Sequence, residues 1–409
     1  MATTHQPGRE AQADAASTST MTGGRTLLFA VAGGAAIGNL YWAQPLLEEI
    51  ATSLGVPSSA AGLLVTVTQI GYAIGIFLLV PLGDVLNRRR FVPIVTAASG
   101  LALAGAAAAP GWVMLFVALL LVGVTAVGAQ LLIPLASELA DDTKRGRVVG
   151  TIASGALIGI LLSRTVSGLV ADAFGWRAIY IIAAITALVF SGVLARVIPT
   201  LPTRPAMPYP TLLRSVFTAV GSHRAVPVTL ILGAATFCTF TLFWTALTFL
   251  LTAPPFSYSL SAVGLVGLAG LAGALMARRA GRFHDRGLST LVTGAALTLG
   301  IASLILAGLG QTSIVVLLIA IVAFDVATQA SLVLNQTRLL TIDPAARSRM
   351  NTAFVTSNFI GGATGSAIAG VLWHAGGWFA VCLGGITVLL LALIVWVSNR
   401  RTLTSANRT

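Results

Sequence analysis

The sequence predicts an all-α polytopic membrane protein, and three observations support that prediction. Of the 409 residues, 9% are charged and 56% are hydrophobic, whereas about 25% of the residues in a soluble domain are charged. The mean hydropathy is +0.93. The apolar residues form long runs, not the short alternating strands of a transmembrane β-barrel. So few charged residues cannot cover a water-facing surface.

Twelve apolar runs are each long enough to cross a bilayer as a helix, which needs about 20 residues. The predicted spans are 26–47, 59–82, 91–109, 112–138, 148–171, 176–197, 226–251, 259–280, 288–308, 312–337, 350–373 and 377–398. We expect a disordered tail over 1–25, a six-helix bundle over 26–197, a linker over 198–225, a second six-helix bundle over 226–398 and a tail over 399–409. Apolar residues on one helical face of the linker predict a short amphipathic helix on the membrane surface.

The distribution of charge predicts the orientation of the chain. The formal net charge is +12, and nearly all cations lie in the loops after every second span. The opposite loops hold Glu48, Glu49 and Asp172, with Arg177 as their cation. By the positive-inside rule, both termini are cytoplasmic in a bacterial-type inner membrane. This placement explains the basic charge without a nucleic-acid partner.

The two halves of the chain repeat at a constant offset of 202 residues. This offset aligns Trp42 with Trp244 and Gly62 with Gly264. Parallel six-helix repeats with a ligand site between them are typical of secondary transporters.

The loop after span two contains Asp84, Arg88 and Arg89 in PLGDVLNRRR, and the loop after span eight contains Asp285 and Arg286 in GRFHDRG. These paired motifs resemble the signature of the major facilitator superfamily (MFS), over about residues 25–400. The resemblance implies the MFS fold, twelve helices in two pseudo-symmetric bundles. It also implies that Asp84 helps to latch the cytoplasmic face between the two halves. A charge cluster that only sets topology is the alternative.

Arg164 is a cation inside predicted span five, in GILLSRTVSG. It could pair with Glu48 or Glu49, bind an anionic substrate or take part in proton coupling, or extend to the outer interface. The small residues around it resemble the antiporter motif of the drug-efflux branch, with Arg164 at the proline position. The offset aligns Arg164 with Ser366, so the arginine has no counterpart in the second half.

Asp325 lies near the middle of predicted span ten. Burial disfavours an ionised carboxylate, and this property suits a reversible proton carrier. Binding of a cation or substrate and a structural hydrogen bond are the alternatives.

The resemblance implies that spans one, four, seven and ten line a central cavity. Polar and aromatic residues on these spans, with one on span two, are candidates for its lining: Asn39, Tyr41, Trp42, Gln44, Gln69, Gln130, Phe240, Trp244 and Gln329. Such a lining suits a moderately apolar organic solute.

The sequence therefore predicts a monomeric secondary transporter in the lipid bilayer, which exports a small organic compound by proton-coupled alternating access. The chain has no nucleotide-binding GxxxxGK[ST] motif, so the proton gradient is the expected energy source in place of ATP. No cofactor and no metal are expected. Enzyme activity is not expected. Proton-coupled uptake of a metabolite or organic anion is the first alternative, and a non-transporting membrane sensor on the same fold is the second.

Overall fold

The described elements of the chain are all helices, as the long apolar runs predict. The computed structural model describes residues 21–141, 143–199, 208–343 and 346–405. Most of the predicted N-terminal tail, the end of the C-terminal tail and the Pro-rich part of the linker lie outside these ranges.

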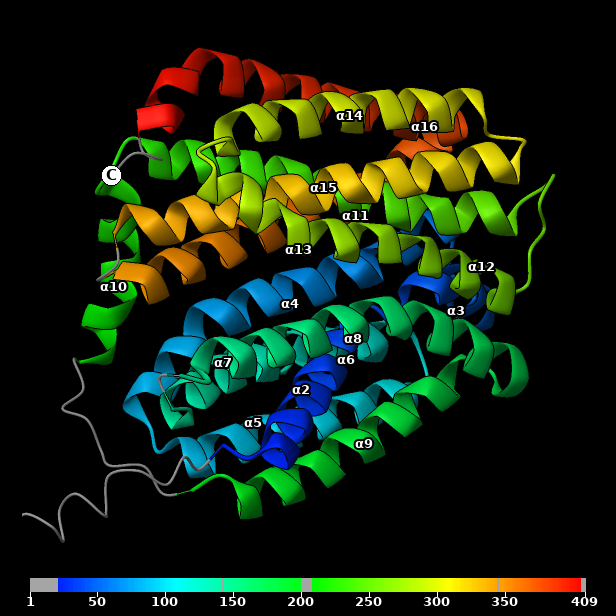
Figure 1. Cartoon of the computed structure of the whole chain (residues 1–409). Helices are drawn as coiled ribbons and strands as arrows, with labels where there is room; N and C mark the ends of the chain where they lie inside the picture. The colour runs from blue at the N-terminus through cyan, green and yellow to red at the C-terminus, as the bar shows by residue number, and fades with distance from the viewer. Residues whose placement is uncertain (1–20, 142, 200–207, 344–345, 406–409) are drawn as a thin grey trace, which may run out of the picture.

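The first half of the chain forms one bundle, which occupies the lower part of Figure 1. Its elements are α2 (Gly23–Gly38), η1 (Gln44–Leu46), α3 (Leu47–Leu54), α4 (Ser58–Val85), α5 (Arg88–Ala107), α6 (Trp112–Thr125), α7 (Gly128–Leu139), α8 (Arg145–Phe174) and α9 (Trp176–Val197).

The second half forms the upper bundle, and the linker helix α10 (Tyr209–Gly221) runs across one end of the molecule (Figure 1). The elements of this bundle are α11 (Ala225–Thr252), α12 (Leu260–Val266), η2 (Gly267–Gly270), α13 (Leu271–Asp285), α14 (Ser289–Leu309), α15 (Ile314–Ile342) and α16 (Arg347–Ser405).

The described chain contains nine helices that are long and apolar enough to cross a membrane, with α6 and α7 counted as one. The last of them, α16, holds two predicted spans, because Gly376 and Gly377 interrupt its helical backbone. Gly377 has φ +61°, a left-handed conformation that favours glycine. Predicted spans one and eight complete the twelve crossings, and each of these two is interrupted by a 3₁₀ turn.

The predicted N-terminal tail of 1–25 ends too late in the sequence, and the predicted C-terminal tail of 399–409 begins too early. Helix α2 already starts at Gly23, where the Thr22 side chain accepts a hydrogen bond from the Arg25 backbone and caps the helix. At the other end, α16 continues to Ser405, well into the predicted tail of 399–409. Leu403 is fully buried, and this packing explains the extra turns.

Span one is not the continuous helix predicted over 26–47. Helix α2 ends at Gly38, and a turn leads into η1, where Pro45 lacks the N–H group that a helix would use. The Trp42 indole donates to Asn39 Oδ1 at 2.8 Å within this turn. The carbonyl groups of the turn are therefore available to neighbouring helices.

The bundles meet tightly at the end of the molecule opposite α10. Thr66 Oγ1 of α4 and Ser366 Oγ of α16 are 2.9 Å apart across the interface between the two bundles, which we call the seam. A methyl group added at Gly62 would lie 3.1 Å from the Ser366 carbonyl oxygen, and one at Gly264 would lie 2.8 Å from that of Arg164. The offset of 202 relates these two glycine contacts, so the seam confirms the predicted repeat.

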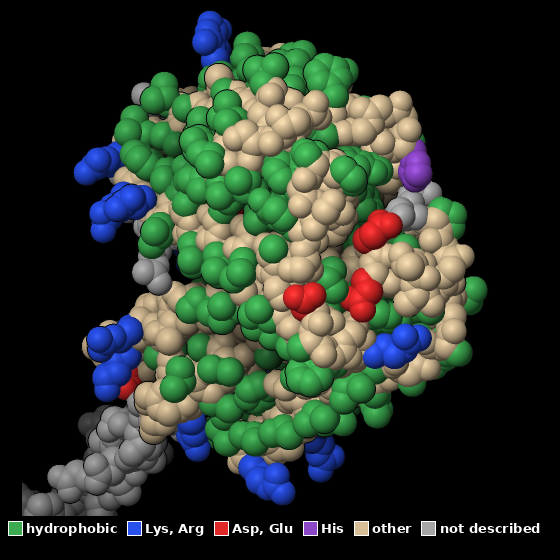
Figure 2. Space-filling view, turned by 90° about the vertical axis from the view of Figure 1, so that its right-hand side faces the viewer, with side chains coloured by type: hydrophobic (Ala, Val, Ile, Leu, Met, Phe, Trp, Pro, Cys, Tyr) green, Lys and Arg blue, Asp and Glu red, His purple; other side chains and the backbone are tan. Residues whose placement is uncertain are grey.

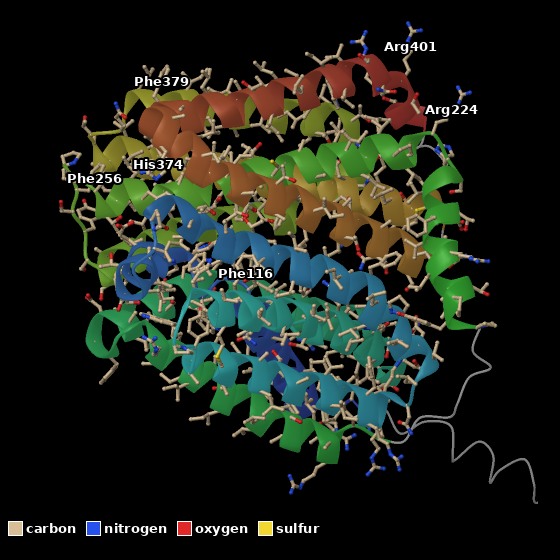
Figure 3. All side chains as sticks on the ribbon, turned by 180° about the vertical axis from the view of Figure 1, so that it is seen from behind. Phe116, Arg224, Phe256, His374, Phe379 and Arg401 are labelled. Atoms are coloured by element: carbon tan, nitrogen blue, oxygen red, sulfur yellow. The ribbon has the colours of Figure 1, made fainter. Side chains whose placement is uncertain are left out.

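The bundles separate at the α10 end, where a cavity of about 920 Å³ lies between them. Arg224 and Arg401 lie at this end, whereas Phe256, His374 and Phe379 lie at the other (Figure 3). Figure 2 looks onto that other end and shows acidic side chains gathered near its centre. The structure is thus closed at the acidic end and open at the α10 end.

Candidate functional site

Arg164 of α8 is buried at the seam with 4% of its surface exposed. Its Nε atom donates to Gln44 Oε1 at 2.7 Å. Its guanidinium carbon lies 4.4 Å from the ring centre of Trp244 and 5.1 Å from that of Tyr41. The ring of Phe240 is 5.7 Å away. Arg164 is therefore held by groups from both bundles, since Trp244 and Phe240 belong to α11.

One interpretation of the sequence predicted that Arg164 pairs with Glu48 or Glu49. The structure does not show this pairing. Glu49 Oε1 instead accepts a hydrogen bond from the Trp176 backbone at 3.2 Å. The broken span one explains this correction, because the glutamates lie on α3, beyond the interruption, whereas Gln44 lies inside it. Burial also excludes extension of Arg164 to the outer interface.

Asp325 of α15 is also buried, with 4% of its surface exposed. Its Oδ1 atom accepts a hydrogen bond from the Trp244 indole nitrogen at 3.2 Å. The same indole stacks on the Arg164 guanidinium, and the opposite charges of Arg164 and Asp325 attract each other. Trp244 thus connects a cation of the first bundle to an anion of the second.

Two glycines of the 3₁₀ turn η2 lie against the side chains of Arg164 and Asp325. A methyl group at Gly267 would lie 3.2 Å from Arg164 Cβ. A methyl group at Gly270 would lie 2.8 Å from Asp325 Oδ2. These glycines were not among the predicted site residues, although their spacing in span eight was the available signal.

The interruption of span one is satisfied by hydroxyl groups from both bundles. Ser167 of α8 donates to the Trp42 carbonyl oxygen at 2.6 Å, and Thr248 of α11 donates to that of Gln44 at 2.9 Å. Irregular backbone at membrane depth is tolerated where protein groups bond it in this way. Neither hydroxyl was predicted, because serine and threonine in helices commonly bond their own helix.

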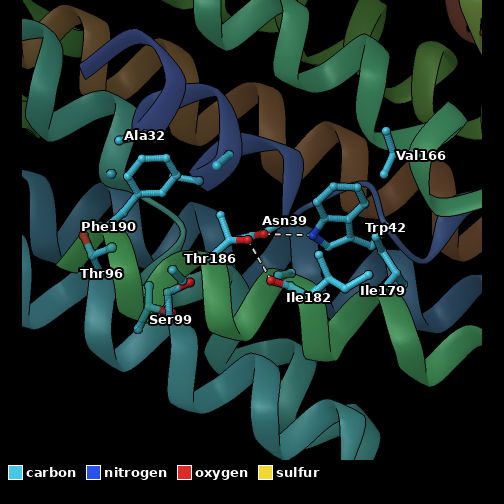
Figure 4. Close-up of a pocket in the computed structure, with 16 residues that line it drawn as sticks. Ala32, Asn39, Trp42, Thr96, Ser99, Val166, Ile179, Ile182, Thr186 and Phe190 are labelled. Atoms are coloured by element: carbon cyan, nitrogen blue, oxygen red, sulfur yellow. Dashed lines mark hydrogen bonds between the residues drawn. The ribbon is translucent and has the colours of Figure 1, made fainter. Parts of the chain in front are cut away.

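The predicted cavity residues do not all meet at one place. Tyr41, Gln44, Phe240 and Trp244 surround Arg164 as described. Asn39 and Trp42 line a separate cavity of about 150 Å³ in the first bundle (Figure 4).

Three predicted residues lie elsewhere in the structure. Gln130 lines the large cavity at the α10 end. Gln69 is buried, and neither its amide oxygen nor its nitrogen has a hydrogen-bond partner among the described residues. Gln329 is half-buried one turn beyond Asp325 on α15.

Asp84 and Arg88 pair within the first bundle and do not latch the two halves together in this arrangement. Arg88 donates to Asp84 at 2.6 Å and to Glu138 at 2.7 Å. All three residues line the cavity at the α10 end. The sequence motif did not identify Glu138, because this residue lies on α7, outside the motif.

The remaining residues of the predicted gate motif are Arg89, Asp285 and Arg286. Arg89 and Arg286 are exposed. The side chain of Asp285 lies outside the described part of the structure.

Comparisons with known proteins identify the family. The family model for the Major Facilitator Superfamily matches residues 28–341. The chain is 43% identical to "Uncharacterized transporter YgaY" of Escherichia coli O157:H7, over 90% of this chain and 94% of that protein. It is 35% identical to "Probable transporter SCO4007" of Streptomyces coelicolor, over 84% of this chain and 80% of that protein.

Two solved structures share the fold at low sequence identity. The nucleoside transporter NupG matches with a TM-score of 0.73 at 14% identity, over 91% of this chain and 98% of that chain. A bacterial homologue of the lysosomal transporter Spinster matches with a TM-score of 0.70 at 15% identity, over 94% and 96% of the two chains.

Proposed function

Because this chain belongs to the Major Facilitator Superfamily, we propose that it is a proton-coupled secondary transporter of a small organic compound. Transport in such a fold proceeds by rocking the two bundles around a site between them. One observation carries the proposal: Asp325 of the second bundle and Arg164 of the first are buried together at the seam and share Trp244.

Protonation of Asp325 changes the electrostatic attraction between the two bundles. The titratable groups around the site, among the described residues, are Arg164, Asp325 and Tyr41. While Asp325 is ionised, it attracts Arg164 across the seam and favours the arrangement that is closed at the acidic end. Protonation removes that attraction. A ligand shifts a conformational equilibrium by its difference in affinity for the two states. The proton is such a ligand, because the affinity of Asp325 for it depends on whether Arg164 is close.

The charge balance of the site favours uptake. When Asp325 is protonated, the positive charge of Arg164 is no longer neutralised, and an anion binds more readily. A proton and an anion that load together move in the same direction, as uptake driven by an inward proton gradient requires. Uptake was the first alternative to export in the sequence analysis.

Export is the second candidate, and it rests on the resemblance of span five to the antiporter motif. The small residues of that motif have a packing role here. A methyl group at Gly168 would meet the backbone of Leu260 in the other bundle, and one at Gly159 would meet that of Gly34 in α2. Close helix approach at small residues accounts for these positions without reference to direction.

We further propose that the α10 end faces the cytoplasm across a bacterial inner membrane, with both termini on that side. The arginines at this end support the orientation, because loops rich in arginine and lysine remain on the cytoplasmic side.

Vesicles with an imposed pH gradient test the proposal. The full chain is reconstituted, and uptake of labelled organic anions, neutral compounds and cations is followed with the gradient in either direction. We expect gradient-dependent flux that Asp325→Asn abolishes and that Asp141→Asn, at the loop between α7 and α8, retains. Equal gradient-dependent flux in Asp325→Asn and the parent contradicts the proton-carrier role. No flux of any solute supports the sensor alternative.

A further inference from the structure

We infer that the substrate is a planar aromatic carboxylate, whose carboxylate group is bound by Arg164 and Gln44. This inference rests on the proposed function, because it names the solute for the same site. The supporting observation is a pair of buried donors without acceptors beside a continuous row of aromatic rings.

The two donors are fixed next to each other. Arg164 Nη2 and Gln44 Nε2 have no hydrogen-bond partner among the described residues. Both side chains are more than nine-tenths buried, at 4% and 1% exposure. The 2.7 Å bond from Arg164 Nε to Gln44 Oε1 holds the guanidinium and the amide together. Buried polar groups are nearly always bonded, and an exception is often functional.

The chemistry of these donors selects a carboxylate. A guanidinium group is planar and matches the two oxygen atoms of a carboxylate with parallel N–H bonds. The adjacent amide N–H supplies a neutral third donor. One positive charge at the site balances one negative charge on the ligand when Asp325 is protonated. An organic cation would be repelled by Arg164.

The rings beside the donors form a row that crosses from one bundle to the other. Phe240, which contacts Arg164, is stacked with Phe237 at 5.7 Å between ring centres. Phe237 lies 4.9 Å from Phe359 of α16, which lies 4.3 Å from Tyr72 of α4. Aromatic rings pack favourably in offset or edge-on contacts at such distances. A flat ring on the substrate can therefore replace contacts within this row.

The open cavity also favours an anion. Among the residues that the structure describes, its charged lining consists of three arginines and two acids. Arg88 is shared by both acids, Asp84 and Glu138. The other two are Arg145 and Arg347, which the offset of 202 relates and which flank the cavity from opposite bundles. The excess positive charge raises the local concentration of anions at the entrance.

Direct binding to the purified full chain, with benzoate as the probe, tests the inference. Three compounds of similar size separate the contributions. Benzamide removes the charge, cyclohexanecarboxylate removes the flat ring, and benzylammonium reverses the charge. By equilibrium dialysis, we expect benzoate to bind about tenfold or more tightly than benzamide or benzylammonium, and severalfold more tightly than cyclohexanecarboxylate.

Variants of Arg164 and Gln44 test whether these two residues bind the carboxylate. Arg164→Gln should abolish the preference for benzoate over benzamide. Arg177→Gln is the matched control, because Arg177 also stacks on a tryptophan, Trp176 at 4.2 Å, but lies near the acidic end. If Arg164→Gln does not fold, Gln44→Leu serves instead, and it should weaken benzoate binding severalfold because the carboxylate loses the amide donor; unchanged benzoate binding contradicts the assignment.

The outcomes separate this inference from the proposed function. Equal affinity for benzoate, benzamide and benzylammonium overturns the carboxylate assignment. Proton-driven flux of a non-carboxylate solute alone also overturns it, and leaves the proposed function intact. Charge-selective benzoate binding without proton-driven flux supports the carboxylate site and contradicts the transport mechanism.

Discussion

Single residues at the seam show how a buried cation is stabilised without a close carboxylate. Among the described residues, no salt bridge involves Arg164; the two that form both involve Arg88. An arginine at the centre of a membrane span costs about 2.5–3.5 kcal/mol on insertion scales. A desolvated cation–π contact contributes about 2 kcal/mol, and Arg164 contacts three rings. Stacking can therefore offset most of the cost.

The shape of the arginine should matter as much as its charge. Arg164→Lys keeps the charge but loses the planar group that stacks on Trp244 and bonds Gln44. We expect proton-driven flux in vesicles to fall about tenfold or more. Arg177→Lys, at the other tryptophan-stacked arginine, should leave flux near the parent value. Parental flux in Arg164→Lys would show that charge alone is sufficient.

Gly270 should be required for the position of the Asp325 carboxylate. In Gly270→Ala the new methyl group would lie 2.8 Å from Asp325 Oδ2 and push the carboxylate away from its present position. We expect weaker dependence of flux on the pH gradient. Gly146→Ala is the control, since a methyl group there meets no atom within 4 Å. Identical gradient dependence in both variants argues against the contact.

At the scale of elements, the two interruptions break the symmetry of the repeat. Span one is broken by a turn and η1, whereas its counterpart α11 is continuous. Span eight is interrupted by η2, whereas its counterpart α4 is continuous. Both interruptions lie against the charge pair: Gln44 bonds Arg164, and Gly270 contacts Asp325. The asymmetric helices and the asymmetric arginine therefore form one site.

Thr248 should stabilise the interrupted span from the opposite bundle. Thr248→Val removes the donor to the Gln44 carbonyl oxygen and leaves that buried acceptor without this bond. The expected loss is about 1–3 kcal/mol, seen as a lower midpoint of thermal unfolding in detergent. Thr252→Val is matched, because Thr252 lies one turn along the same helix and, among the described residues, bonds only that helix. Equal midpoints for the two variants would contradict this role.

At the scale of the whole molecule, one end of the seam is closed and the other is open. The closed end has hydroxyl and glycine contacts between α4 and α16 and between α8 and α12. The open end has the cavity of about 920 Å³. Alternating access requires the closed contacts to separate during each cycle.

A disulfide across the closed end should stop transport reversibly. Thr66→Cys with Ser366→Cys places two thiols where the hydroxyl oxygens are now 2.9 Å apart, within the reach of a disulfide bond. We expect efficient oxidation and loss of flux that a reductant restores. Val149→Cys with Asn351→Cys, on facing sides of the open cavity, should cross-link poorly. Full flux in the oxidised Thr66/Ser366 variant would contradict movement at this seam.

The sequence by itself determined the class of protein, the twelve crossings, the repeat and the family. These properties depend on the length of apolar runs, on loop charge and on internal offsets, all of which are local or periodic. It also identified Arg164 and Asp325 as unusual, because charges inside apolar runs are costly wherever the helices pack.

Only the tertiary structure decided what these charges meet. Gln44 and Arg164 are 120 residues apart, and Trp244 and Asp325 are 81 residues apart. Such contacts depend on where Pro45 and the η2 glycines interrupt their spans and on how closely the bundles approach. Hydrophobicity determines that a helix is buried, but the packing of both bundles determines which side chain faces Arg164.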